Sequence, residues 1–340
     1  LEQDTALQIF LPEPLPAGGQ LQITLPFTGS VPLDFGPGYG IFNLSQEVLA
    51  LAGWYPLLAV YDEDGWNLDP VSEIGDSVYS EIAWYTVELQ APETVVWAAT
   101  GEVSAARVED HDQFLRLNGG AARDFFLIGS PRFQVLSTTV GETRLAVYYL
   151  PGQEQAAQTA LNIAADSFRI FSEKFGPYPY RELDIVSAPM QYALGVEFPG
   201  IVLIALELYE EPQDPSFAVT IAHELAHQWW YSAVGNDVFD EPWLDEGLAT
   251  YSSSLYYEFR PGGGSAQGLF DYWQQRYEGL VQEGKDDQVG HDFHPFAHAV
   301  DGAVMVRPAL EVDAVEEAQR AAAEEVGNPE LRPHEGRGRP

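Results

Sequence analysis

The apolar residues of this chain change their period once, near residue 151, and this change limits the folds that the sequence can adopt. Up to about residue 150, apolar and polar residues alternate in short runs that are rich in β-branched and aromatic side chains. A period of two is typical of strands with one buried face. We therefore predict antiparallel strands over residues 20–27, 80–89, 93–101 and 124–131, and a hairpin over 132–151 with Gly141 in its turn.

After residue 151 the period becomes helical. Residues 153–176 place apolar side chains three and four positions apart, and Gly176 and Pro177 close the run. Two strands and three more helices are expected beyond it. We place the strands at 182–189 and 200–206, and the helices at 266–283 and from Asp214 and Glu241 onward.

These patterns predict an α+β protein. We divide it into an amino-terminal antiparallel β-sheet domain at 1–150, a mainly helical domain at 151–283 and a tail at 284–340. A chain of 340 residues, of which 46% are hydrophobic, is long enough to bury a large core and to form two domains.

The tail differs from the rest of the chain in composition. No tyrosine follows Tyr277 and no tryptophan follows Trp273, although both are frequent earlier. We expect the tail to be disordered, truncated or read in a shifted frame. Its histidines His291, His294 and His298 are irregularly spaced in a polar stretch, so we interpret them as solvated side chains and not as a second metal site.

The charge and the absence of cysteine exclude several classes of function. The chain carries 52 acidic and 16 basic residues, for a net charge of −36, and has no cysteine. Such a negative field repels phosphate backbones, so nucleic acid is not an expected partner. Without cysteine there are no disulfides, thiolate metal sites or cysteine nucleophiles, and any metal must bind through nitrogen and oxygen.

No transmembrane helix is expected. The longest apolar run, at 48–61, is too short for a bilayer and contains Gly53 and Pro56. The sequence begins with Leu1 instead of methionine, and we expect that an original amino terminus has been lost. The compartment therefore stays open between secreted and cytoplasmic.

The stretch IAHELAHQWW, at 221–230, places His223 and His227 four positions apart with Glu224 directly after the first. Residues four apart project from one face of a helix, so both imidazoles can reach one metal ion. Glu224 lies close enough to serve a water molecule at that ion. The alternative for this motif alone is a core helix with two hydrogen-bonded histidines, and a third ligand has to decide between the two.

Glu246, in the stretch PWLDEGLATY, follows His227 by 19 positions and is the candidate third ligand. The spacing lets one helix end and a second helix, with Pro242 in its first turn, return across the first. Two histidines and a glutamate favour one Zn²⁺ ion, which makes water ionise near neutral pH. With Glu224 as general base and later as acid, the residues predict metal-assisted hydrolysis of an amide.

The HELAHQWW motif, the spacing to the glutamate of WLDEGLATY and the order of the predicted domains resemble the gluzincin aminopeptidases, the group that contains aminopeptidase N and leukotriene hydrolase. The resemblance implies an amino-terminal β domain followed by a thermolysin-like catalytic domain. It implies zinc on His223, His227 and Glu246, with Glu224 as the acid and base.

The same resemblance implies a substrate site in the stretch ALGVEFPG. Members of the family carry a Gly-x-Met-Glu-Asn signature in which the glutamate binds the free α-amino group of the substrate and a backbone glycine aligns the peptide. Glu197 stands at the glutamate position and Gly195 is retained beside it. Leu194, Val196 and Phe198 replace the first glycine, the methionine and the asparagine, which leaves the preference for a free amino terminus open.

A second departure concerns the family tyrosine that donates a hydrogen bond to the oxyanion, because this chain has no tyrosine after Tyr277. Loss of such a donor typically lowers turnover by a factor of about 10²–10³. Either another group replaces it or the tail after about Glu283 is not the native one.

The function expected from these observations is that of a zinc aminopeptidase acting on peptides with a free amino terminus. Two alternatives stay open: a zinc endopeptidase with the same metal and base, and a non-catalytic scaffold that retains zinc and binds peptides or proteins. A scaffold does not require a base beside the metal, so the intact Glu224 argues for the enzyme.

Overall fold

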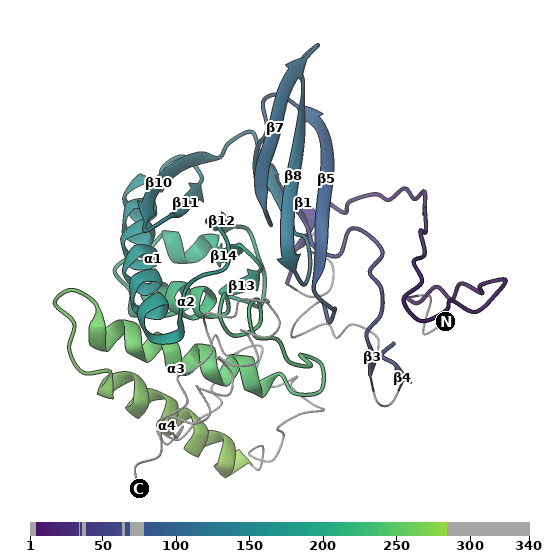
Figure 1. Cartoon of the computed structure of the whole chain (residues 1–340). Coiled ribbons are helices and arrows are strands. Elements are labelled where there is room, and N and C mark those ends of the chain that lie inside the picture. The colour runs from purple at the N-terminus through teal and green to yellow at the C-terminus, as the bar shows by residue number, and fades with distance from the viewer. Residues whose placement is uncertain (1–4, 34, 36–38, 63–64, 69–77, 284–340) are drawn as a thin grey trace, which may run out of the picture.

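The computed structural model describes residues 5–33, 35, 39–62, 65–68 and 78–283. Within them the chain forms a mixed α+β structure, with antiparallel sheets first and helices last, as the change of period predicts (Figure 1). The predicted tail at 284–340 lies outside the described residues.

The described amino-terminal part contains three antiparallel sheets. One has the strand order β1 (Phe42–Ser45), β2 (Val48–Leu51), β9 (Leu127–Ser130) and β6 (Val96–Ala99). The next has the order β5 (Ala83–Pro92), β8 (Asp112–Ala122) and β7 (Glu102–Glu109), and it projects from the body of the molecule in Figure 1. The last is the short pair β3 (Tyr61–Asp62) and β4 (Gly65–Trp66).

The strand predicted over residues 20–27 is wrong. The alternating residues are present, but Leu21, Ile23, Leu25 and Phe27 are between 40% and 55% exposed and the segment belongs to no strand. A strand needs a neighbour to satisfy its backbone groups and to bury its apolar face. The apolar period of a segment describes only its own side chains. It does not show whether a partner strand lies beside the segment.

The second part is built on a five-stranded sheet with the order β10 (Gln134–Val140), β11 (Thr143–Tyr149), β12 (Glu182–Ala188), β14 (Ile201–Ala205) and β13 (Gly195–Phe198). The pairs β11–β12 and β12–β14 are parallel, and the other two pairs are antiparallel. The predicted hairpin is confirmed as β10 and β11, with Gly141 at a positive φ of 62° in the turn. Because this hairpin pairs with β12, the sheet runs across residue 151, where the sequence places the domain boundary.

Four helices follow the predicted order: α1 (Glu154–Phe175), α2 (Pro215–Ala226), α3 (Trp243–Phe259) and α4 (Gln267–Glu283). A 3₁₀ turn over Leu206–Tyr209 leads from the sheet toward α2. Helix α1 packs on α2 and on the hairpin strands, while α2 also contacts α3, β13 and β14. Within the described residues, no helix combines the length and the apolar character that crossing a bilayer requires.

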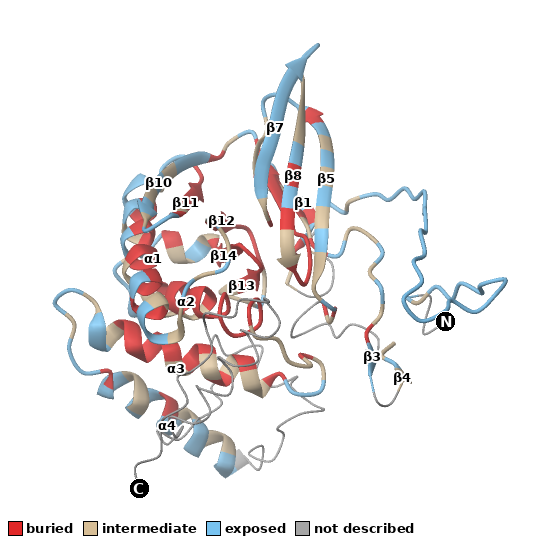
Figure 2. Ribbon diagram, in the orientation of Figure 1, coloured by how far each residue is buried: buried red, intermediate tan, exposed pale blue. Residues whose placement is uncertain are grey.

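The strands β11, β12, β14 and β13 are mostly buried, whereas the edge strand β10 is exposed or half-buried and is drawn pale blue and tan in Figure 2. On β14, Val202 and Ile204 lie in the core shared with the helices, whereas Ile201 and Leu203 lie in the core shared with the amino-terminal sheets. This explains why the strand reads as an unbroken apolar run and not as an alternation. On β13, Val196 and Phe198 also face the amino-terminal sheets, so Glu197 projects toward the helices.

A buried glutamine ties β13 to the end of α2. Gln228 accepts hydrogen bonds from the backbone of Gly200 at 2.9 Å and from the Tyr178 hydroxyl at 3.3 Å, and donates to the carbonyl of Phe198 at 3.0 Å. Its side chain is 0% exposed. Gln228 thus fixes the turn between β13 and β14 against α2.

We expect Gln228→Leu to lower the free energy of unfolding by about 3 kcal/mol, because it leaves the Gly200 amide and the Phe198 carbonyl buried without these partners. Urea unfolding of metal-free protein measures the change. The control is Gln158→Leu on the exposed surface of α1, expected to stay within about 0.5 kcal/mol of the unaltered chain. A loss no larger than that of the control would contradict the role of Gln228.

Candidate metal centre

Helix α2 begins where the sequence predicts. The Asp214 side chain accepts a hydrogen bond from the backbone of Ser216 at 2.8 Å, and Pro215 occupies the first helical position. Phe217, Ile221 and Leu225 recur every four residues, are 0% exposed and lie in the core. Their burial fixes the rotation of the helix and so determines where the next residues project.

His223 and His227 face one another at the end of this helix. Their Nε2 atoms are 3.1 Å apart, with the rings at 77° to each other. His227 follows the last helical residue but keeps a helical φ of −61°, so the spacing of four positions still brings both rings to one side. The structure therefore confirms that the two predicted histidines lie side by side on one face of the helix.

Glu246 is brought to this pair by α3, which begins one residue after Pro242. Its Oε2 atom is 3.1 Å from His223 Nε2 and 3.9 Å from His227 Nε2. Ligands about 2.0–2.1 Å from a tetrahedral ion are separated by roughly 3.3 Å, close to these spacings. The three side chains thus form a group able to hold one metal ion through two nitrogens and an oxygen.

The protonation states of His227 and Glu246 suit a metal. Burial lowers the pKa of His227 to about 4 against the opposing charge of Glu246, with a smaller contribution from His223, so its imidazole is neutral at physiological pH. Burial alone would raise the pKa of Glu246, but the hydrogen bond and charge of His223 outweigh it and hold that pKa below its usual value. Neutral imidazole and ionised carboxylate are the forms that bind metal.

The remaining ring nitrogens also have neighbours. His227 Nδ1 is 3.0 Å from the carbonyl oxygen of Trp230, and His223 Nδ1 is 3.5 Å from Thr250 Oγ1. Such contacts orient a ligand histidine through its second nitrogen. Sequence reasoning missed both, although the position of Thr250, one helical turn after Glu246, was a usable signal.

Glu197 and Asp245 lie on the other side of His227. Glu197 Oε1 is 3.6 Å and Asp245 Oδ2 3.7 Å from His227 Nδ1, and both side chains are buried. Asn236 donates a hydrogen bond to Asp245 at 2.9 Å. Asp245 was not among the predicted site residues, although it directly precedes Glu246 in the sequence.

This arrangement concentrates negative charge. Burial raises the pKa of Glu197 well above its usual value, and the nearby carboxylates of Glu224, Glu246 and Asp245 raise it further. Like charges in a desolvated place disfavour each other's ionised form, and a cation relieves that cost. The site is therefore suited to positively charged ligands.

Glu224 and Gly195 are placed against each other. Glu224 is 5% exposed, and a Cβ atom added to Gly195 would overlap its carboxyl group. The backbone of β13 thus runs directly along the Glu224 side chain, and the missing side chain at position 195 leaves room for it. All six predicted site residues, Gly195, Glu197, His223, Glu224, His227 and Glu246, consequently come from the contact between β13, α2 and α3.

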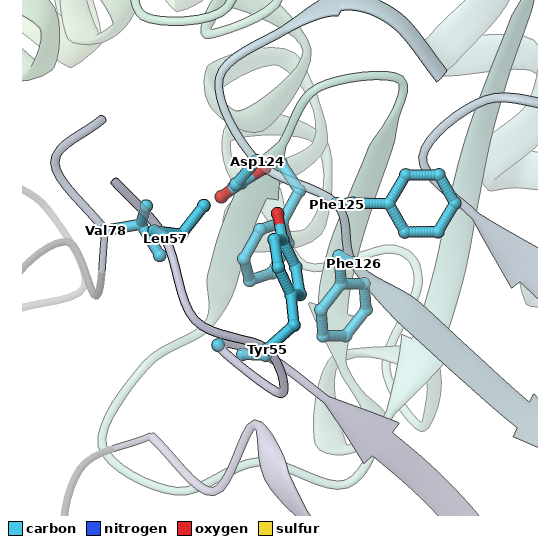
Figure 3. A pocket seen from close by; sticks show the side chains of 9 residues that line it. Tyr55, Leu57, Val78, Asp124, Phe125 and Phe126 are labelled. Atoms are coloured by element: carbon cyan, nitrogen blue, oxygen red, sulfur yellow. The ribbon is translucent and has the colours of Figure 1, made fainter. Parts of the chain in front are cut away.

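A small hollow lies on the opposite face of β13 and is separate from this cluster. It is lined by Tyr55, Asp124, Phe126 and Phe198, among others, and Figure 3 shows the Tyr55 ring pointing toward Asp124. The rings of Phe126 and Phe198 stack at 4.1 Å. Burial raises the pKa of Asp124 to about 7, against the opposing effects of the Tyr231 hydrogen bond and the Arg123 charge.

Comparison with known proteins gives a match to a family domain. Residues 159–311 match the peptidase family M1 domain, a range that continues past the described residues into the predicted tail. The chain is 32% identical to aminopeptidase 2 of Candida albicans over 148 residues, which is 40% of this chain and 16% of that protein. It is 36% identical to the alanine/arginine aminopeptidase of Saccharomyces cerevisiae over 115 residues, which is 32% of this chain and 13% of that protein.

A longer match joins the chain to aminopeptidase M1 of Arabidopsis thaliana, with 28% identity over 187 residues, or 51% of this chain and 19% of that protein. In each of these relatives the matched part spans less than a fifth of the full length. Residues 159–311 are therefore similar to the peptidase family M1 domain, and the predicted resemblance to the aminopeptidases related to aminopeptidase N is confirmed.

Proposed function

We propose that this chain is part of a zinc aminopeptidase, which removes amino-terminal residues from peptides. The observation that carries the proposal is the convergence of His223 Nε2, His227 Nε2 and Glu246 Oε2 from two helices at 3.1–3.9 Å from one another. The family domain and the names of the matched relatives, which are aminopeptidases, support the same reaction.

His223, His227 and Glu246 would hold one zinc ion. The chain has no cysteine, and a set of two histidines and one carboxylate is a donor set that catalytic zinc takes. When bound, zinc lowers the pKa of water and polarises the carbonyl of the scissile amide. The protein's part is to keep His227 neutral and Glu246 ionised, as burial and the His223 contact do here.

Glu224 is the general base in this proposal. Its carboxylate takes a proton from the attacking water and later delivers a proton to the nitrogen of the leaving amine. Two observations support this role: the Glu224 carboxylate is near enough to Glu197 to raise the pKa of that residue, and its 5% exposure keeps bulk water away from the carboxyl group. Contact with the backbone of Gly195 limits where that group can lie.

Glu197 would bind the free α-amino group of the substrate, with the backbone at Gly195 aligning the peptide. The surrounding carboxylates support this role, because an ammonium group offsets part of the charge that accumulates around Glu197. The net charge of −36 acts in the same direction over a longer range. Peptides that begin with a free amine are therefore the proposed substrates.

Glu224→Gln should lower kcat by about 10²–10⁴-fold, because glutamine keeps the shape and loses the base. Hydrolysis of aminoacyl-coumarin amides by zinc-loaded protein measures the rate, and elemental analysis checks that the variant holds as much zinc as the unaltered chain. Full activity in the variant would exclude Glu224 as the base. Stoichiometric zinc without activity in the unaltered chain would favour the scaffold.

Acetylation of the substrate's amino terminus should abolish hydrolysis, and Glu197→Gln should lower kcat/KM for free amines by about 10–100-fold through loss of a charge-assisted contact. The matched control is Glu173→Gln on the exposed face of α1, which should leave kcat/KM unchanged. Equal rates on acetylated and free substrates would identify the alternative, an endopeptidase.

Gly195→Ala should lower kcat by about 100-fold, because the added methyl group displaces the Glu224 carboxyl group. Zinc content should not change, since neither histidine is touched. Gly268→Ala, on the exposed side of α4 with open space around the position, is the control. Unchanged kcat in Gly195→Ala would show that Glu224 works from a different position.

A further inference from the structure

The residue that follows the two tryptophans after α2 has an unusual backbone. Tyr231 has a φ of 118°, a region that side chains larger than hydrogen rarely occupy. A bulky aromatic residue keeps such a conformation only where its surroundings impose it.

The conformation of Tyr231 sets the direction of the preceding carbonyl. The peptide plane between Trp230 and Tyr231 turns with the φ of Tyr231, and its oxygen is the acceptor for His227 Nδ1 at 3.0 Å. The turn is closed by hydrogen bonds from the Ser232 amide to the His227 carbonyl at 2.9 Å and from the Tyr231 amide to the Val234 carbonyl at 2.7 Å. The backbone at Tyr231 thus orients the imidazole of a proposed zinc ligand.

Two consecutive residues of the amino-terminal part hold Tyr231 at both ends. Arg123 Nε donates a hydrogen bond to the Tyr231 carbonyl at 2.9 Å, and the Tyr231 hydroxyl donates to Asp124 Oδ2 at 3.3 Å. Arg123 and Asp124 lie between β8 and β9 and are 7% and 4% exposed. The Arg123 side chain also donates to the Ser80 carbonyl at 3.3 Å, which fixes the guanidinium from the far side.

The loop after α2 is shaped to receive this arginine. A Cβ atom added to Gly235 would overlap the guanidinium group of Arg123. The φ of Gly235 is not in the left-handed region, so its backbone accepts alanine and the overlap is the obstacle. The glycine is therefore explained by the arginine that lies against it.

We propose that Arg123 and Asp124 are positioning residues for metal binding: they hold Tyr231 in its left-handed conformation, which keeps the Trp230 carbonyl on His227. The inference rests on the proposed function insofar as His227 is a zinc ligand. It assigns the loop between β8 and β9 of the amino-terminal part a role in metal affinity. Loss of a group that orients a ligand histidine typically weakens metal binding about 10–100-fold.

The test measures the zinc dissociation constant of the full chain by competition with a chromogenic chelator. Gly235→Ala displaces Arg123 without changing any residue of the network, and Tyr231→Phe removes only the hydroxyl. We expect zinc binding to weaken about 10–100-fold in Gly235→Ala and by a smaller factor in Tyr231→Phe. The visible spectrum of the Co²⁺-substituted protein should change shape in Gly235→Ala, while Gly268→Ala should match the unaltered chain in both measurements.

A rescue separates this role from a general loss of stability. Glycine adopts a φ of 118° without strain. The double variant Gly235→Ala with Tyr231→Gly should therefore recover most of the lost zinc affinity, even though it buries less aromatic surface. Arg123→Lys, which keeps the charge but not the Nε–H donor, serves in place of Gly235→Ala if that variant does not fold.

The outcomes are distinct. Failure of the unaltered chain to bind one zinc ion would overturn the proposed function and this inference with it. Zinc binding by the unaltered chain, with the same dissociation constant in folded Gly235→Ala or Arg123→Lys, would overturn the inference alone. A lowered melting temperature with unchanged zinc affinity would likewise reduce Arg123 to a structural contact.

Discussion

Apolar packing around α2 is the interaction on which the metal centre depends. Full burial of Phe217, Ile221 and Leu225 contributes about 1.5–3 kcal/mol for each side chain. The groups that this helix presents, by contrast, gain little from one another, because Glu224 and its neighbouring carboxylates repel in a desolvated place. The apolar packing therefore holds the carboxylates together although they repel one another. A bound cation would relieve that repulsion.

Local signals in the sequence predicted the elements that carry the site. Asp214 and Pro215 mark the start of α2, and the spacing of His223 and His227 needs only helical geometry. The position of Glu246 required one tertiary assumption, that a second helix returns across the first, and the structure confirms the approach at 3.1 Å. These predictions succeeded because each relied on residues close in sequence or on a single crossing of two helices.

The supporting contacts could not be predicted in the same way. Arg123 and Tyr231 are 108 positions apart, and no periodicity connects them. In the sequence, Gln228 is one more polar residue after the histidine motif. Only the fold shows that it donates a hydrogen bond to the Phe198 carbonyl at the end of β13. The segment at 20–27 fails for the opposite reason, since its pattern is that of a strand and the described residues offer it no neighbour. Strand pairing and hydrogen bonds between residues far apart in the sequence become visible only in the folded chain.

The order of strands in the central sheet has a consequence for synthesis on the ribosome. Strand β13 is made before β14, yet it pairs with β14 at the edge of the sheet. Only Pro199 and Gly200 separate the two strands, so they can pair as a local hairpin before β14 joins β12, whereas the helices that face Glu197 come from later in the chain. Gly195 can therefore meet Glu224, and Glu197 can meet His227, only after α2 has been synthesised, so a nascent chain has no acidic cluster until most of the domain has emerged.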